Sequence, residues 1–133
     1  MKLTIYTDGG ARGNPGPAGL GVVIYNEKKI LIGEISEYLG VATNNQAEYK
    51  ALIAALKKAK TLGATDLQFY LDSELVVKQL NREYKVKNKD LAPLFLEVYN
   101  LSLSFKNIKF SHIRRELNHE ADQLANEAMD RGH

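Results

Sequence analysis

The sequence predicts an α/β fold built around a mixed β-sheet, and two patterns support that prediction. The first third contains three successive strand-like segments separated by turn residues, which is typical of an antiparallel meander. The remainder alternates amphipathic helical segments with short apolar strands, which favours parallel strands joined by helical crossovers. With 133 residues, of which 44% are hydrophobic, we expect one domain spanning residues 1–133 with a sizeable core.

The first strand is predicted at residues 2–8, where apolar and polar side chains alternate up to Asp8. The segment that follows, GGARGNPGPAG, holds glycines and prolines that permit tight turns and a close approach of the backbone to a ligand. Residues 20–25 and 29–39 complete the meander. Asp8 is therefore expected at the end of a strand, beside a glycine-rich loop.

A helix is predicted from residue 43 to about residue 62. It begins with TNNQ, in which Thr43 and Gln46 have the spacing of a capping box, and Glu48 stands at the same spacing after Asn45. Glu48 also shares the apolar stripe of the helix in its first turn. Its carboxylate is expected either to cap the helix or to lie at the edge of the buried face.

A short apolar strand at residues 67–71 ends at Asp72, and a helix follows over residues 73–81. The crossover predicts that this strand lies parallel to the first, so Asp8 and Asp72 would meet at one edge of the sheet. The meander extends to one side of the first strand and the crossover lands on the other. That edge is then a topological switch point, where open α/β sheets bind ligands.

The last third predicts a basic loop at residues 82–89, a helix at 90–103 and a strand at 107–113. A loop at 114–117 leads into a final helix that runs to about residue 131, with Asn118 as its N-cap. Asp122 borders the apolar stripe of this helix in its first turn. For the basic loop, a simple solvated face is the alternative to nucleic-acid contact.

Four acidic residues thus stand at strand ends or in first helical turns beside apolar surface: Asp8, Glu48, Asp72 and Asp122. Burying several carboxylates together is costly through desolvation and repulsion unless cations compensate. Because the chain has no Cys and three His, we expect an oxygen-liganded Mg²⁺ site, with Mn²⁺ as the alternative ion. Each residue alone has an ordinary explanation as a cap or turn former, but the topology brings two of them together.

Four segments carry a resemblance to a known family: TDGGARGNPGPAG, TNNQAEYKAL, LDSELVVKQL and RRELNHEADQLANEA. In this order they resemble the motifs of type 1 ribonuclease H, which cuts the RNA strand of RNA/DNA hybrids. The resemblance implies a ribonuclease H-like fold, a five-stranded mixed sheet of order 3-2-1-4-5 with helices on both faces. It also implies two Mg²⁺ ions held by Asp8, Glu48, Asp72 and Asp122, a two-metal mechanism, and products with 5′-phosphate and 3′-hydroxyl ends.

The resemblance also assigns residues to the nucleic acid. Small residues in the glycine loop would let the main chain approach a 2′-hydroxyl, and the loop at residues 82–89 would grip the DNA strand with an affinity that falls as salt rises. Helix capping is the alternative for the two asparagines after Thr43. The substrate-binding residues implied are Gly9, Gly10, Asn14, Thr43, Asn44, Asn45, Tyr84, Lys85 and Lys87.

Two departures separate the chain from many members of the family. The segment after the predicted fifth strand has no histidine where many members place one for product release, and Arg115 or Glu116 is expected to substitute, as in the His-lacking archaeal and bacterial branch. The inserted basic handle of some members is also missing. Two alternatives stay open: a nuclease of the same fold that also or mainly cuts double-stranded RNA, and a catalytically idle hybrid-binding module.

The remaining features concern the cellular location and the partners of the protein. The net charge is +2, and no apolar run is long enough for a signal peptide or a membrane-spanning helix. We expect a cytoplasmic monomer with no membrane association and no obligate protein partner.

Overall fold

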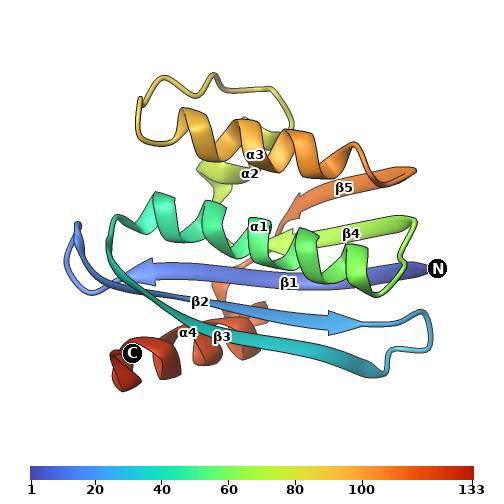
Figure 1. The fold of residues 1–133 in the computed structure, drawn as a ribbon, viewed down its shortest axis with the longest axis horizontal. Coiled ribbons are helices and arrows are strands. Elements are labelled where there is room, and N and C mark those ends of the chain that lie inside the picture. Colours follow the sequence, from blue (N-terminus) through green and yellow to red (C-terminus); the bar gives the residue numbers. More distant parts are fainter.

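The computed structural model describes residues 1–133 (Figure 1). Five strands form one mixed sheet in the order β3-β2-β1-β4-β5, which confirms the predicted topology. The first three strands pair antiparallel, whereas β4 lies parallel to β1, and β5 lies parallel to β4. The strands are β1 (Lys2–Ala11), β2 (Gly16–Tyr25), β3 (Leu31–Ala42), β4 (Asp66–Leu71) and β5 (Asn107–His112).

Helices cover both faces of the sheet, as Figure 1 shows. One face carries the main core, where apolar strand residues such as Ile5 and Phe69 pack against the stripe of α1. α4 lies on the other face, against β1, β2 and β3. The helices are α1 (Asn44–Thr61), α2 (Glu74–Leu80), α3 (Ala92–Ser102) and α4 (His119–Arg131), with one 3₁₀ turn, η1 (Arg115–Leu117), before α4. None of the helices combines the length and hydrophobicity needed to cross a bilayer.

Glycines in β2 set how closely α4 approaches the sheet. A Cβ atom at Gly21 would collide with the carbonyl oxygen of Ala121, and one at Gly19 would lie 2.7 Å from the carbonyl oxygen of Ala125. The bare strand backbone therefore lets α4 rest directly on β2. This contact brings the first turn of α4, with Asp122, to the edge of the sheet where β1 and β4 end their pairing.

The strand that carries Asp8 is longer than predicted. β1 continues to Ala11, because the hairpin with β2 extends to the pair Ala11 and Ala18. Its parallel pairing with β4 stops earlier, at Tyr6 opposite Tyr70. Asp8 therefore lies where β1 parts from β4, and the prediction that it ends a strand is wrong.

Candidate active site

A cleft of about 450 Å³ opens where β1 parts from β4. Asp8 from β1, Glu48 from α1 and Asp72 after β4 line it, and one oxygen from each of the three carboxylates lies within 4.8 Å of the other two. Asp8 and Glu48 are 7% and 5% exposed, and Asp72 is half-buried. The expectation that Asp8 and Asp72 share one edge of the sheet is confirmed, and Glu48 joins them from the helix.

Local structure explains how Glu48 reaches the cleft. The predicted capping box at the start of α1 is present and is formed by Thr43 and Gln46. Glu48 therefore does not cap the helix. Glu48 Oε1 instead accepts a hydrogen bond of 3.0 Å from the backbone N–H of Gly9. A Cβ atom at Gly9 would collide with the backbone of Ala47, so this glycine lets the first turn of α1 lie against β1.

Asp122 lies at the rim of the same cleft, in the first turn of α4. Its side chain is 33% exposed, and its Oδ1 lies 4.0 Å from Nη2 of Arg115. Asp122 does not belong to the group of three oxygens within 4.8 Å. The structure therefore places three of the four predicted carboxylates together and the fourth beside them.

Burial and mutual repulsion govern how these carboxyls titrate. Burial raises the pKa of Asp8, and the charges of Glu48 and Asp72 raise it further. Burial also raises the pKa of Glu48, although the hydrogen bond from Gly9 opposes that shift. For Asp72, burial raises the pKa, and a hydrogen bond from Asn118 lowers it. The metal-free site therefore disfavours three simultaneous negative charges, which a bound cation would offset.

The residues fit a divalent metal ion. Their ligand atoms are all carboxylate oxygens, the type that Mg²⁺ and Mn²⁺ prefer. Glu48 Oε2 is buried and has no hydrogen-bond partner in the protein, so it has lone pairs available for a cation. A cavity that supplies three convergent, mutually repelling carboxylates suits a cation far better than a neutral ligand.

The predicted asparagines organise the rim of the cleft. Asn44 Oδ1 accepts a hydrogen bond of 2.8 Å from the backbone N–H of Ala11, and Asn14 Oδ1 accepts one of 3.0 Å from the backbone N–H of Asn44. These bonds tie the loop after β1 to the start of α1. Thr43, not an asparagine, is the N-cap of α1. Asn44 and Asn45 line the cleft, whereas Asn14 does not.

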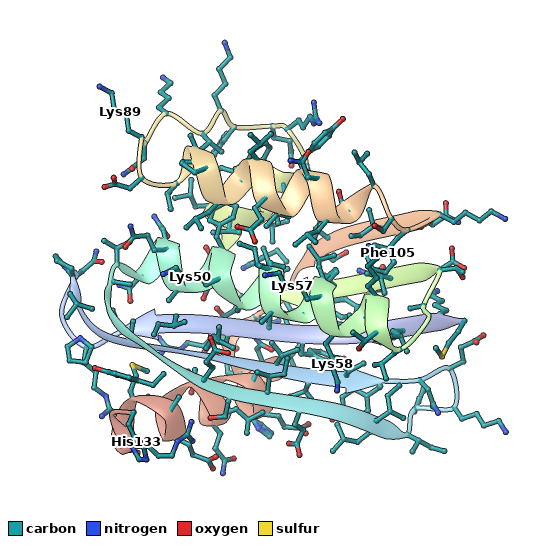
Figure 2. All side chains as sticks on the ribbon, viewed as in Figure 1. Lys50, Lys57, Lys58, Lys89, Phe105 and His133 are labelled. Carbon is teal, nitrogen blue, oxygen red and sulfur yellow. The ribbon has the colours of Figure 1, made fainter.

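The basic loop lies apart from the carboxylates. Tyr84, Lys85 and Lys87 are exposed, and none of them lines the cleft. Tyr84 and Lys85 instead border a separate cavity of about 370 Å³ between this loop and α3. Figure 2 shows Lys89 extending outward from the same loop. Any contact of these side chains with a ligand must therefore be remote from the carboxylates.

The two predicted substitutes for the loop histidine differ in position. Both side chains are exposed, but Arg115 lines the cleft and faces Asp122, whereas Glu116 does not line it. Both belong to η1, the 3₁₀ turn in the segment predicted as a loop. Of the two, Arg115 has the better position to act on a ligand in the cleft.

The sequence analysis missed Arg12 as a lining residue of the cleft and did not predict the contacts of Asn118, which does not line it. Arg12 lines the cleft and forms an ion pair of 2.6 Å with Asp130, which ties the glycine loop to the end of α4. Its place in the motif next to Asp8 could have identified it. Asn118 was predicted as a helix cap, but it makes no capping hydrogen bond and is buried with its amide on the sheet. No local sequence pattern could have indicated that contact.

A second cavity of about 460 Å³ lies beside α4 and holds an aromatic cluster. Tyr6 stacks on Tyr70 with 5.2 Å between ring centroids, and the hydroxyl of Tyr25 donates a hydrogen bond of 2.8 Å to Glu120. Glu120 is the one carboxylate among the residues that line this cavity. Its chemistry therefore does not rival that of the carboxylate cleft as a candidate catalytic site.

Comparison with known proteins gives concordant matches. The chain matches the family model described as "Reverse transcriptase-like" over residues 6–128. It is 44% identical to the N-terminal RNase H domain of Rv2228c from Mycobacterium tuberculosis, with a TM-score of 0.95 over 98% of this chain and 100% of that chain. RNase H1 from Halobacterium salinarum NRC-1 is 40% identical, with a TM-score of 0.96 over 98% and 99% of the two chains.

A third solved relative, LC11-RNase H1, is 46% identical, with a TM-score of 0.92 over 97% of both chains, and its structure is a complex with an RNA/DNA hybrid. The chain spans only part of some relatives. It covers 36% of the length of the whole M. tuberculosis protein, which is named as bifunctional, and 65% of the H. salinarum ribonuclease HI sequence.

Proposed function

Because the chain belongs to the type 1 ribonuclease H family, we propose that it is a metal-dependent endoribonuclease that hydrolyses the RNA strand of RNA/DNA hybrids. The expected products carry 5′-phosphate and 3′-hydroxyl ends, and residues 1–133 would form one ribonuclease H domain. The observation that best supports this proposal is the cluster of Asp8, Glu48 and Asp72 in a cleft at the edge of the sheet. A hybrid is the proposed substrate because LC11-RNase H1 binds one in its solved complex.

The four carboxylates are proposed to hold two Mg²⁺ ions, with Mn²⁺ as the alternative. Such ions activate the attacking water and stabilise the leaving 3′ oxygen when bound. Asp8 and Glu48 are the most buried of the set, so they would form the base of the site, with Glu48 held by the Gly9 hydrogen bond. Asp72 and Asp122 are more exposed and would complete the site from the side that faces solvent.

The surrounding residues are proposed to position the hybrid. Asn45 and the part of Asn44 that faces the cleft can donate to or accept from an RNA strand, whose 2′-hydroxyl does both. Thr43 keeps its hydroxyl proton, since its oxygen is the acceptor in the helix cap, so it can still donate to a phosphate. Gly9 is buried and gives its N–H to Glu48, and its substrate contact stays a prediction together with that of Gly10.

Farther from the cleft, Tyr84, Lys85 and Lys87 are proposed to meet the DNA strand. Their exposure and the positive charge of their loop support this assignment, since nucleic-acid backbones attract such side chains by releasing counterions. The aromatic ring of Tyr84, held by Lys78 at 5.0 Å from the ring centroid, offers a surface for stacking on a sugar or base.

The test is direct cleavage. End-labelled RNA/DNA hybrid, double-stranded RNA and double-stranded DNA are incubated with Mg²⁺ and the wild type, Asp8→Asn or Asp66→Asn. Asp66 is a partly exposed aspartate at the opposite end of β4, hydrogen-bonded to Asn107, and serves as the matched control. We expect the wild type and Asp66→Asn to cut the hybrid and Asp8→Asn to leave it intact. An uncut hybrid with wild type, or equal cutting by Asp8→Asn, contradicts the proposal, and the double-stranded RNA arm decides the alternative substrate.

A further inference from the structure

Asn118 lies between η1 and α4 and is 1% exposed. Its Nδ2 donates one hydrogen bond of 2.9 Å to the carbonyl oxygen of Thr7 and another of 3.3 Å to Oδ2 of Asp72. One amide group thus joins β1 to the residue that follows β4. The bond to Asp72 connects a buried neutral side chain directly to one of the three clustered carboxylates.

This contact occurs where the sheet no longer holds the two strands together. The parallel pairing of β1 and β4 stops at Tyr6 and Tyr70, and Thr7 and Asp72 both lie beyond that pair. In this gap the backbone ladder cannot fix the spacing of the two strands. The Asn118 side chain bridges them at the level of the carboxylates.

The side chain of Asn118 makes no hydrogen bonds other than these two. Its Oδ1 is buried and has no hydrogen-bond partner, so only the two donor bonds hold the amide. Asparagine is a preferred N-cap residue, yet Asn118 stands at the N-cap of α4 and makes no side-chain capping bond. The amide therefore bridges the gap between β1 and β4 and does not cap α4.

We propose that Asn118 is a positioning residue for metal binding: it holds Oδ2 of Asp72 so that the other oxygen of that carboxylate is presented to a cation beside Asp8 and Glu48. The kinetic part of this inference rests on the proposed function, whereas the cation-binding part does not. Groups that orient a ligating carboxylate in this way commonly change metal affinity or activity 10- to 100-fold when removed. Asn118 acts through Asp72 and does not itself touch substrate.

A purely structural role would produce a different pattern. If Asn118 only anchored α4 to the sheet, its removal would lower the melting temperature but leave the cation affinity of the folded protein unchanged. A positioning role predicts weaker cation binding in protein that is still folded. It also predicts a lower kcat with little change in KM, because the groups proposed to bind the hybrid lie elsewhere on the rim.

The experiment compares the wild type, Asn118→Ala and Asn107→Ala. Asn107 donates an amide hydrogen bond of 2.8 Å to Asp66 at the opposite end of the same sheet, so its variant removes the same kind of bond away from the site. Mn²⁺ is titrated by calorimetry without substrate, and hybrid cleavage gives kcat and KM separately. We expect Asn118→Ala to bind Mn²⁺ roughly 10- to 100-fold more weakly and to lose a similar factor in kcat, and Asn107→Ala to match the wild type.

Wild-type Mn²⁺ affinity in folded Asn118→Ala overturns the proposal, as does equal weakening by Asn107→Ala. If Asn118→Ala does not fold, Asn118→Ser decides in the same assays, since its hydroxyl is a donor too short to reach both acceptors and is expected to weaken Mn²⁺ binding as well. A wild type that binds Mn²⁺ but cuts no hybrid refutes the proposed function alone, and the titration still tests Asn118.

Discussion

Gly9 donates its backbone N–H to Glu48 Oε1 at 3.0 Å and, through its missing side chain, leaves room for the turn of α1 that carries Glu48. The two residues are far apart in sequence, and their contact brings the helical carboxylate to the strand carboxylate. The buried position of Glu48 in the site thus depends on a hydrogen atom at the Cα of Gly9.

Gly9→Ala should therefore damage both stability and metal binding. The added methyl collides with the backbone of Ala47, which cannot move without shifting α1, so we expect a loss of about 1–3 kcal/mol in the free energy of unfolding. Urea denaturation measures it. Gly10→Ala is the matched control, because a Cβ there meets only Asn44 Oδ1 at 3.8 Å, and similar unfolding free energies for the two variants would contradict the packing argument.

Asp8→Asn should stabilise the metal-free protein while it abolishes cleavage. Burial first, and then the charges of Glu48 and Asp72, raise the pKa of Asp8 to about 10, so folding without metal at pH 7 requires Asp8 to take up a proton. Each pKa unit between the ordinary value and pH 7 costs about 1.4 kcal/mol, and asparagine avoids that cost. Thermal unfolding in excess chelator at pH 7 measures the effect, and we expect a higher melting temperature than that of the wild type. Added Mn²⁺ should stabilise the wild type more than the variant. A lower melting temperature for Asp8→Asn than for the wild type in chelator would contradict the proposal that Asp8 destabilises the metal-free protein at pH 7.

The stability of the metal-free protein should fall as pH rises. The pKa values of Asp8 and Glu48 are raised above their ordinary values of 3.8 and 4.5, so the folded state binds more protons than the unfolded chain above those values. Their contribution is complete below about pH 4 and is lost progressively as pH increases towards the raised pKa values. Chemical denaturation across pH 5–8 in chelator should show this slope, and Asp8→Asn should flatten it. A slope that is the same in both proteins would contradict the assignment.

Neutralising the basic loop should weaken hybrid binding and its salt dependence without affecting the metal site. For Lys85→Ala combined with Lys87→Ala, we expect the slope of log affinity against log salt to fall by about 1–2, as each lost phosphate contact releases fewer counterions. Fluorescence anisotropy in Ca²⁺ measures it. A control pair, Lys28→Ala with Lys60→Ala, removes equal charge from the turn between β2 and β3 and from the end of α1, which lie away from the basic loop in Figure 1. An equal change in slope for this pair would show that only net charge matters.

Arg115→Ala should slow turnover more than Glu116→Ala. Arg115 lines the cleft near Asp122, whereas Glu116 does not line it. Comparing single- and multiple-turnover rates for the two variants separates chemistry from product release, and we expect the larger loss, about tenfold, in multiple turnover for Arg115→Ala. A larger loss for Glu116→Ala would restore that residue as the substitute for the family's histidine.

The predictable part of the fold came from local patterns. Alternation in β1 and the apolar run of β4 placed Asp8 and Asp72 at one edge, because a crossover between parallel strands leaves little choice of topology. The capping box of Thr43 and Gln46 also appeared as predicted, since it depends on residues three positions apart. Such features need no knowledge of distant contacts.

The unpredictable part depends on contacts between distant segments. The extension of β1 beyond Asp8 is set by pairing with β2, and the burial of Asn118 is set by its position over the gap between β1 and β4. An asparagine before a helix predicts a capping hydrogen bond, and the sequence alone does not show whether its side-chain amide makes that bond or another one. The separation of Arg115 from Glu116 likewise depends on the 3₁₀ turn and its docking beside α4.

The carboxylates of the cleft come from β1, α1, the end of β4 and α4, and no short segment supplies two of them. The unfolded chain therefore brings no two of these carboxylates together, and a divalent ion held by them would bind almost exclusively to the native state. At a concentration 100 times its dissociation constant, such an ion stabilises the folded protein by about 2.7 kcal/mol. The availability of the proposed ion would then control not only the chemistry of the site but also the fraction of chains that remain folded and escape proteolysis.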